Sequence, residues 1–314
     1  MSYCSPSNQG IYLKDKTCFD KKGLIELANA WNRIFTDKPK INNINKKTKK
    51  QLWDELNQRM TPICQGSGRE WCWVDKLGKE KESIRPPIPS EWYTKPYAWL
   101  SNFDIEAVMK QYAEDERNLY AFLGVQPIDF AAKNVFGTCT VSDLCNFNLM
   151  TYIDKGIKYL GLITNLDRHD QSGSHWTSTF ACIDPNSSCF GAYYYDSVGQ
   201  GRAPKEIIHF MNKVLKVQAE NYAQSIGIKR KFITKVNIKQ HQHGNTECGV
   251  FSMAYQIRWI RMLQQKPDAK FEDVIQINID DDDIHQLRNI LFRPNTRVEL
   301  AKNDKNAKKL KNKK

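Results

Sequence analysis

Four residues of the types used in nucleophilic catalysis lie in the second half of the sequence: His175, Asp196, Gln242 and Cys248. His175 precedes a segment typical of a strand, and Asp196 ends the next one. If these segments pair antiparallel through a turn at 184–188, His175 and Asp196 lie side by side. Cys248 opens an amphipathic helical pattern, and the N–H groups at a helix start lower the pKa of a cysteine from about 8.5. The sequence therefore predicts a Cys-His-Asp site.

These residue types support one mechanism, acyl transfer to a cysteine. The thiolate attacks a carbonyl carbon, the imidazole takes the thiol proton and later donates one to the leaving amine, and the carboxylate orients the imidazole. The side-chain amide of Gln242 and the backbone N–H of Cys248 would donate to the oxyanion, and each such donor is typically worth about 3 kcal/mol. This mechanism needs no cofactor.

The elements that would position these residues indicate a mixed α+β domain. The strand candidates are short, rich in β-branched or aromatic residues and bounded by turn residues. The helix candidates show apolar residues at steps of three and four. We predict strands at 158–166, 176–184, 190–196 and 232–238, helices at 105–112, 203–216 and 249–263, and a last helix after the acidic run 280–283.

The proline cluster at 86–89 is the best candidate for a domain boundary. Residues 1–90 are predicted to form a small, mainly helical domain, with helical patterns at 24–35 and 49–59. Residues 91–298 would form the α+β core with a central mixed sheet flanked by helices, and residues 299–314 a basic, disordered tail.

The composition excludes several classes of protein. The 314 residues are 40% hydrophobic and 26% charged, which excludes collagenous, mucin-like and wholly disordered chains. No segment approaches the roughly 18 apolar residues of a membrane span, and the first residues lack the apolar core of a signal peptide. The nine cysteines, odd in number and irregularly spaced, favour free thiols over a disulfide framework. We therefore expect neither secretion nor membrane insertion.

The net charge of +12 is concentrated in two lysine-rich segments, residues 38–50 and 301–314. Each carries a net +6, so the rest of the chain is neutral overall. Solvated loops and a frayed tail explain this charge most simply. The alternative is attraction to DNA or another polyanion.

The motifs His175-Trp176, Asp196 and Gln242-x5-Cys248-Gly249 resemble the signature of the ubiquitin-like-protein-specific and adenain-type cysteine proteases. The order His, Asp, Cys is also that of this clan. Within it, the segments 242–249 and 281–293 look most like the polyprotein-processing proteases of African swine fever virus and related giant DNA viruses. The resemblance spans roughly residues 97–295. One departure is Asp196, where the swine fever enzyme has Asn.

This resemblance implies a papain-like, adenain-type core, with residues 1–90 corresponding to an N-terminal arm domain. It implies cleavage of Gly-Gly-Xaa sites in viral structural polyproteins, in viral factories of the host cytoplasm and in virions. By the same resemblance, Trp99 and Trp176 would wall a narrow tunnel that admits only glycine before the scissile bond. A core position at a helix start is the alternative for Trp99.

Other interpretations remain open. The same catalysis could act on conjugates of ubiquitin-like proteins, or the fold could be catalytically silent and bind nucleic acid through its lysine-rich segments. His241 and His243 with Cys248 have the residue types of a zinc site but lack a second spaced pair. The acidic run Asp280–Asp283 lacks the spacing of a calcium loop and more simply caps the helix that follows.

Overall fold

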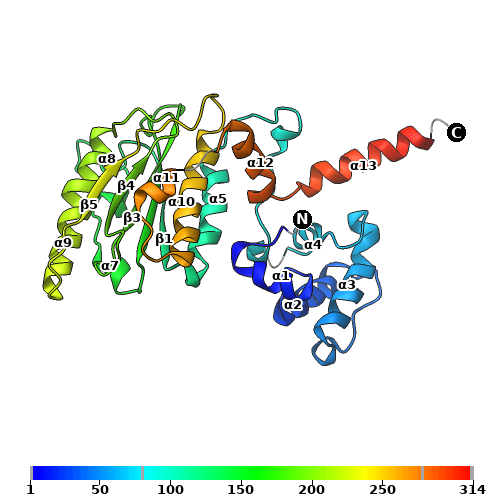
Figure 1. The fold of residues 1–314 in the computed structure, drawn as a ribbon. Coiled ribbons are helices and arrows are strands. Elements are labelled where there is room, and N and C mark those ends of the chain that lie inside the picture. The colour runs from blue at the N-terminus through cyan, green and yellow to red at the C-terminus, as the bar shows by residue number, and fades with distance from the viewer. Residues whose placement is uncertain (1–2, 79–80, 277–278, 312–314) are drawn as a thin grey trace. The chain divides into compact units, whose positions relative to one another are not determined.

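The computed structural model describes residues 3–78, 81–276 and 279–311, with side chains up to residue 305. The chain divides into two compact units, one formed by Met1–Pro96 with Arg288–Lys314 and the other by Tyr97–Leu287 (Figure 1). This division differs from the predicted ranges 1–90, 91–298 and 299–314. The first unit extends beyond the proline cluster, and the chain returns to it at Arg288.

Backbone hydrogen bonds explain why the C-terminal segment belongs to the first unit. The N–H of Ile88 donates to the carbonyl of Arg293 at 2.7 Å, and the N–H of Arg293 donates to the carbonyl of Pro86 at 2.9 Å. The guanidinium of Arg293 also pairs with Asp75 at 2.6 Å. The proline cluster thus pairs with residues more than 200 positions away, a contact that the local sequence does not reveal.

Helices form the first unit. The predicted patterns at 24–35 and 49–59 correspond to α2 and α3. Apolar residues of α2 and α3 pack with Trp73 in one buried cluster. A capping box between Thr48 and Gln51 begins α3. The helices are α1 (Gln9–Asp15), α2 (Lys21–Ile34), α3 (Lys49–Cys64), α4 (Glu70–Leu77) and α13 (Thr296–Lys311).

Helix α13 corrects the prediction of a disordered tail at 299–314. It begins at Thr296, whose hydroxyl donates to Asp75 at 2.7 Å, and it continues to Lys311. Lysine, alanine and leucine dominate its sequence, and these residues have high helix propensity. A run of lysines therefore predicts charge but does not by itself predict disorder.

Three disulfides correct the expectation of free thiols: Cys4–Cys18, Cys64–Cys72 and Cys139–Cys145. The paired Cα atoms lie 5.1 to 5.9 Å apart, within the usual range for such bonds. The odd number of cysteines does not argue against disulfides, because three thiols, Cys182, Cys189 and Cys248, remain free beside the three pairs.

A five-stranded mixed sheet forms the centre of the second unit, as predicted for the α+β core. Its strands lie in sequence order, with β1 parallel to β2, β2 and β3 antiparallel, β3 and β4 antiparallel, and β4 parallel to β5. The four predicted strands are β2 to β5. Strand β1 was not predicted; Gly124, with φ of +95°, lies where its register shifts. The strands are β1 (Tyr120–Gln126), β2 (Tyr159–Asn165), β3 (Trp176–Cys182), β4 (Gly191–Tyr195) and β5 (Ile233–Val236).

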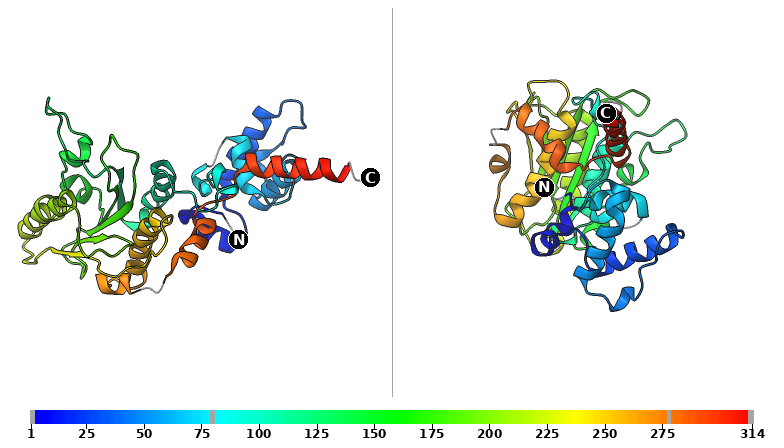
Figure 2. Two further views of the ribbon diagram at one scale, coloured as in Figure 1. Left: turned by 90° about the horizontal axis from the view of Figure 1, so that it is seen from above. Right: turned by 90° about the vertical axis from the view of Figure 1, so that its right-hand side faces the viewer.

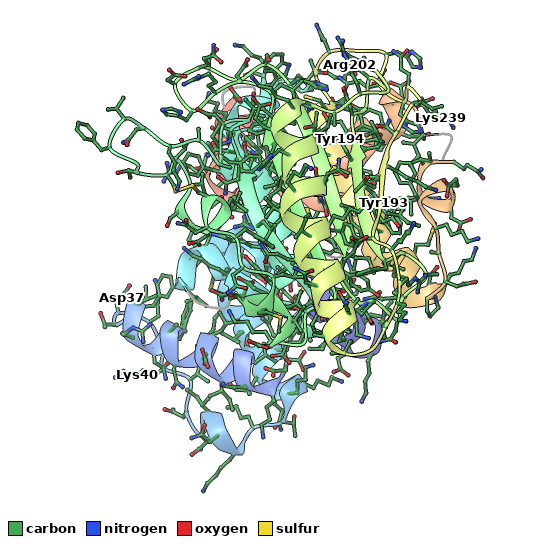
Figure 3. The ribbon with its side chains drawn as sticks, turned by 90° about the vertical axis from the view of Figure 1, so that its left-hand side faces the viewer. Asp37, Lys40, Tyr193, Tyr194, Arg202 and Lys239 are labelled. Atoms are coloured by element: carbon green, nitrogen blue, oxygen red, sulfur yellow. A yellow bond between two sulfur atoms is a disulfide. The ribbon has the colours of Figure 1, made fainter. Side chains whose placement is uncertain are left out.

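Helices cover both faces of this sheet (Figures 1 and 2). Successive strand residues point to opposite faces. Tyr195 stacks on Tyr255 of α10, with ring centroids 4.4 Å apart, whereas its neighbour Tyr194 lies in the apolar cluster that contains Phe210. Tyr193, on the same face as Tyr195, lies 5.0 Å from the Trp259 ring of α10 (Figure 3). Helices α5 (Asn102–Ala113) and α10 (Cys248–Gln265) therefore cover one face, and α8 (Lys205–His209), a π-helical stretch (Phe210–Leu215) and α9 (Lys216–Ser225) cover the other.

The remaining helices of the second unit lie at its ends and connections: α6 (Ser142–Cys145), α7 (Met150–Ile153), α11 (Phe271–Ile275) and α12 (Asp281–Leu291), whose last turn belongs to the first unit. Within the described ranges, none of the helices combines the length and the apolarity that a membrane span requires.

Candidate active site

The pairing of β3 and β4 places His175 and Asp196 together. The strands are antiparallel, with Ser178 opposite Tyr195, as predicted. His175 immediately precedes β3 and Asp196 immediately follows β4, so both lie at the same end of the sheet. Nε2 of His175 lies 2.8 Å from Oδ1 of Asp196. Because Nε2 faces the carboxylate, Nδ1 is the ring nitrogen left for a nucleophile.

Asn237, which the sequence analysis missed, fixes the backbone of Asp196. It follows β5, the parallel neighbour of β4, and its side chain is fully buried. Its Oδ1 accepts from the Asp196 N–H and its Nδ2 donates to the Asp196 carbonyl, both at 2.8 Å. The N–H of Val198 also donates to the Asp196 carboxylate at 3.0 Å. The sequence signal that could have indicated Asn237 was a polar residue within the predicted strand 232–238.

The surroundings of His175 favour its protonated form. Burial alone lowers the pKa of the imidazole, but hydrogen bonds and charge interactions with Asp196 and Cys248 outweigh it and raise the pKa to about 9. Cys248, at the start of α10, is one of the groups that raise this pKa. An imidazole with a raised pKa can hold and deliver a proton, which nucleophilic catalysis by a cysteine requires of its partner.

Cys248 begins α10, as predicted, and its side chain is only 3% exposed. The next residue allows close packing at this point. A Cβ on Gly249 would lie 3.2 Å from both Leu100 Cδ1 and Trp176 Cδ1, closer than most carbon contacts. Glycine therefore lets the first turn of α10 approach the tryptophan that follows His175.

Gln242 is buried on the loop before α10, and both ends of its side-chain amide are bonded. Oε1 accepts from the hydroxyl of Ser197 at 2.6 Å, and Nε2 donates to the carbonyl of Gly244 at 3.1 Å. The N–H of Gln242 also donates to the carbonyl of Ser197 at 3.0 Å. Ser197, also missed from sequence, thus fixes which end of the amide donates.

Trp99 and Trp176 both line a pocket of about 450 Å³ in the second unit. The indole N–H of Trp176 donates to the carbonyl of Leu100 at 3.1 Å, which holds this ring in place. Trp99 is 46% exposed, so it is not the core aromatic of the alternative interpretation. The rest of the lining is largely polar and includes Asn165, Arg168 and Gln171.

The metal alternatives do not fit the geometry. The ring nitrogens of buried His241 lie 3.1 Å from the Tyr195 hydroxyl and 3.1 Å from the Ile275 carbonyl, so both have partners other than a metal. Among the described residues, no group of three or more acidic, histidine or cysteine side chains is arranged to hold an ion. The acidic run begins α12, and Asp281 contacts the loop that carries Gln242.

Comparison with known proteins places this chain among viral proteases. No family model matches the chain. R355 of Acanthamoeba polyphaga mimivirus, which is assigned as a thiol protease, is 31% identical over 313 residues, covering 93% of this chain and 94% of R355. The SUMO-1 cysteine protease of African swine fever virus is 28% identical over 133 residues, covering 42% of this chain and 43% of the swine fever protein.

A solved structure supports the fold. The crystal structure of the African swine fever virus protease aligns with a TM-score of 0.58 at 18% identity, covering 94% of this chain and 96% of that one. The predicted papain-like α+β class is therefore confirmed. The predicted relationship is also confirmed, because R355 is similar over nearly the whole of both chains. The chain belongs to the family of viral cysteine proteases that includes R355 and the swine fever virus enzyme, and it is a cysteine-type peptidase.

Proposed function

We propose that the protein is an endopeptidase in which Cys248 is the nucleophile, His175 the general acid and base, Asp196 the group that orients the imidazole, and Gln242 an oxyanion donor. The observation that carries this proposal is the 2.8 Å contact between His175 and Asp196, together with Cys248 at the start of a helix and among the groups that raise the pKa of His175. The His175 imidazole and the Cys248 sulfur form the reactive pair.

The reaction then follows in two steps. The Cys248 sulfur bonds to the substrate carbonyl carbon, and the electron pair of the carbonyl double bond moves to the oxygen, which accepts from Gln242 Nε2 and the Cys248 N–H. His175 gives its proton to the amine, and the C–N bond breaks to leave a thioester. Water, deprotonated by His175, then attacks the thioester, and the thiolate leaves. Gln242 Nε2 carries two N–H donors, so one can keep its bond to Gly244 while the other donates to the oxyanion.

We propose Gly-Gly-Xaa sites as the substrate sequence. Trp176 is held by Leu100 and packs at Gly249 beside the nucleophile, and Trp99 lines the same pocket. Two indole rings beside the scissile bond exclude a substrate Cβ by steric contact. Replacing either glycine of a Gly-Gly-Xaa peptide by alanine is expected to reduce kcat/KM strongly, and the variant Trp99→Ala to reduce that discrimination.

The decisive experiment compares the wild-type protein with Cys248→Ala on a Gly-Gly-Xaa peptide. The variant is expected to lose cleavage, since it lacks the sulfur that forms the thioester. Cys189→Ala is the matched control, because it removes a free thiol that has no role in the mechanism. Cleavage by Cys248→Ala at the wild-type rate contradicts the proposal.

The proposed substrates are viral structural polyproteins, processed in viral factories of the host cytoplasm and in virions. The relationship to viral proteases supports this class of substrate. Mass spectrometry of peptides released from a pool of viral precursors would reveal the new termini. Termini without Gly-Gly before the cleaved bond would refute the sequence preference.

A second candidate is the removal of ubiquitin-like proteins from conjugates. The name of the swine fever relative, a SUMO-1 cysteine protease, favours it. A ubiquitin-like probe with a C-terminal electrophile is expected to label Cys248 if conjugates are the substrates. If polyproteins are the substrates, a short peptide aldehyde is expected to outcompete that probe.

We also propose that the lysine-rich segments contact DNA or another polyanion. Within 38–50, Lys47 and Lys49 pair with Glu55 and Asp15, whereas Lys40, Lys46 and Lys50 are exposed (Figure 3 labels Lys40). Replacing these three lysines with glutamine, or deleting 301–314, is expected to weaken retention on DNA and to flatten its dependence on salt. Unchanged retention after both changes would exclude this contact.

A further inference from the structure

The acidic start of α12 has a contact that helix capping does not explain. Oδ2 of Asp281 accepts from the backbone N–H of His243 at 2.9 Å and from that of Gly244 at 2.8 Å. Both donors belong to the loop between Gln242 and Cys248, almost 40 residues earlier in the chain. A carboxylate that accepts two N–H groups fixes the orientation of both peptide planes.

The next turn of the same helix holds the other end of this loop. Nδ1 of His285 lies 3.2 Å from Oε1 of Glu247, the residue before Cys248. Glu247 is only 3% exposed, and the His285 ring stacks on Tyr97 with centroids 4.4 Å apart. Because Asp281 and His285 are four residues apart, they lie on one face of α12.

These contacts lead directly to the oxyanion donors. Gly244 donates its N–H to Asp281, and its carbonyl, in the next peptide unit, accepts from Nε2 of Gln242. At the other end, Glu247 precedes the Cys248 N–H, the second donor. The positions of both donors therefore depend on a loop that α12 holds at two points.

We propose that Asp281 and His285 are positioning residues that set the geometry of the oxyanion hole through the loop 242–247. This inference rests on the proposed function, in which Gln242 and the Cys248 N–H donate to the oxyanion. Neither residue acts on the substrate. Their effect is specific to steps in which a carbonyl oxygen becomes charged.

The first test compares Asp281→Ala with Asp282→Ala in the full-length protein. Asp282 is an exposed acid on the same turn of α12, so its removal changes the charge without touching the loop. Asp281→Ala is expected to lower kcat for a Gly-Gly-Xaa peptide by about 10- to 100-fold with KM changed less than about threefold, because loss of one oxyanion donor costs about 100-fold or more. Asp282→Ala is expected to match the wild type.

A second measurement separates the oxyanion hole from general damage to the site. A peptide aldehyde adds to Cys248, and the new oxygen occupies the oxyanion hole, whereas iodoacetamide alkylates the sulfur by displacing iodide and forms no oxyanion. Asp281→Ala and His285→Ala are expected to bind the aldehyde about tenfold or more weakly while they react with iodoacetamide at the wild-type rate. Equal losses in both reactions overturn the proposal.

Two further variants extend this test, and the first serves if Asp281→Ala folds poorly. Asp281→Asn retains an oxygen that accepts N–H groups, so it is expected to recover most of kcat. In a Gln242→Ala background, Asp281→Ala is expected to add little further loss, because the two residues act through one donor. Fully additive losses, or an unchanged kcat for Asp281→Ala, refute the positioning role. If the wild type itself cleaves no Gly-Gly-Xaa peptide, the proposed function fails instead.

Discussion

The two sides of the candidate active site are built differently. On the strand side, His175 and Asp196 meet because two antiparallel strands end together, so backbone pairing sets their distance. On the loop side, Gln242 and Cys248 depend on side chains from separate segments, namely Ser197, Asp281 and His285. Backbone pairing between strands tolerates most side-chain substitutions. A loop that is held by a few side chains can be displaced by a single substitution.

The largest expected effect is on the strand side. His175→Ala removes the group that we propose to carry the proton in both chemical steps, so kcat/KM is expected to fall by about 10⁴-fold. His209→Ala, an exposed histidine of α8, is the matched control. Steady-state kinetics on one peptide substrate decides this, and a loss below about tenfold would exclude His175 as the general acid and base.

Gln242→Ala tests the loop side and is expected to have the next largest effect. It removes one of the two proposed oxyanion donors, so kcat is expected to fall by about 10²- to 10³-fold while KM changes little. Gln224→Ala, on the exposed surface of α9, is the control. If KM rises and kcat is retained, Gln242 binds substrate instead of stabilising the transition state.

Asp196→Asn separates charge from geometry on the strand side. At about pH 6 the imidazole is protonated and has an N–H on both ring nitrogens, so the amide oxygen can accept the same hydrogen bond and the rate is expected to stay within about tenfold of wild type. The pKa of His175, raised to about 9 in the wild type, is expected to fall by about 1–3 units without the carboxylate charge. The alkaline limb of the pH–rate profile should therefore move to lower pH, and an unmoved limb would contradict the assignment.

The same pKa shift makes a prediction for stability. A folded-state pKa raised above 6.5 means that the protonated imidazole stabilises the fold. This contribution is fully present below pH 6.5 and is lost as the pH rises to about 9. Urea unfolding of the wild type and of Asp196→Asn should show their free energies of unfolding converging across this interval.

The smallest expected effect comes from Asn237→Ala. This substitution removes both hydrogen bonds to the Asp196 backbone, and loss of such buried partners costs about 1–3 kcal/mol of unfolding free energy. Because the β3–β4 pairing remains, we expect kcat to fall by less than about tenfold. A larger loss of kcat would show that the strand side depends on single side chains as much as the loop side does.

The strand side could be predicted from sequence because His175 and Asp196 flank two strands that are consecutive in the chain and paired in the sheet. Two short strands joined by a tight turn have few possible arrangements, so the His175–Asp196 pair follows from their ends. Asn237 and Asp281 could not be predicted in this way. Each is separated from its partner by about 40 residues of sequence, which include α8 and α9 for Asn237 and α10 for Asp281. No periodic pattern in the sequence indicates contacts of this kind.

The disulfides show a different failure of sequence reasoning. Each joins cysteines only 6 to 14 residues apart, so their proximity depends on the loop between them. Cysteine counts favour a framework only when all the cysteines take part. Here a nucleophile candidate and two buried thiols make the count odd, which conceals three pairs.

Because the protein has both a free thiol at Cys248 and disulfides, a reductant in the buffer acts on both. Cys248 must stay reduced, since oxidation beyond sulfenic acid is irreversible for such a residue. Reducing agents that protect it also attack cystines they can reach. The Cys4–Cys18 and Cys64–Cys72 bridges are shielded from solvent, but Cys139 and Cys145 are partly exposed. A reductant will therefore open the 139–145 bridge first, and preparations of equal activity can differ in the loop it closes.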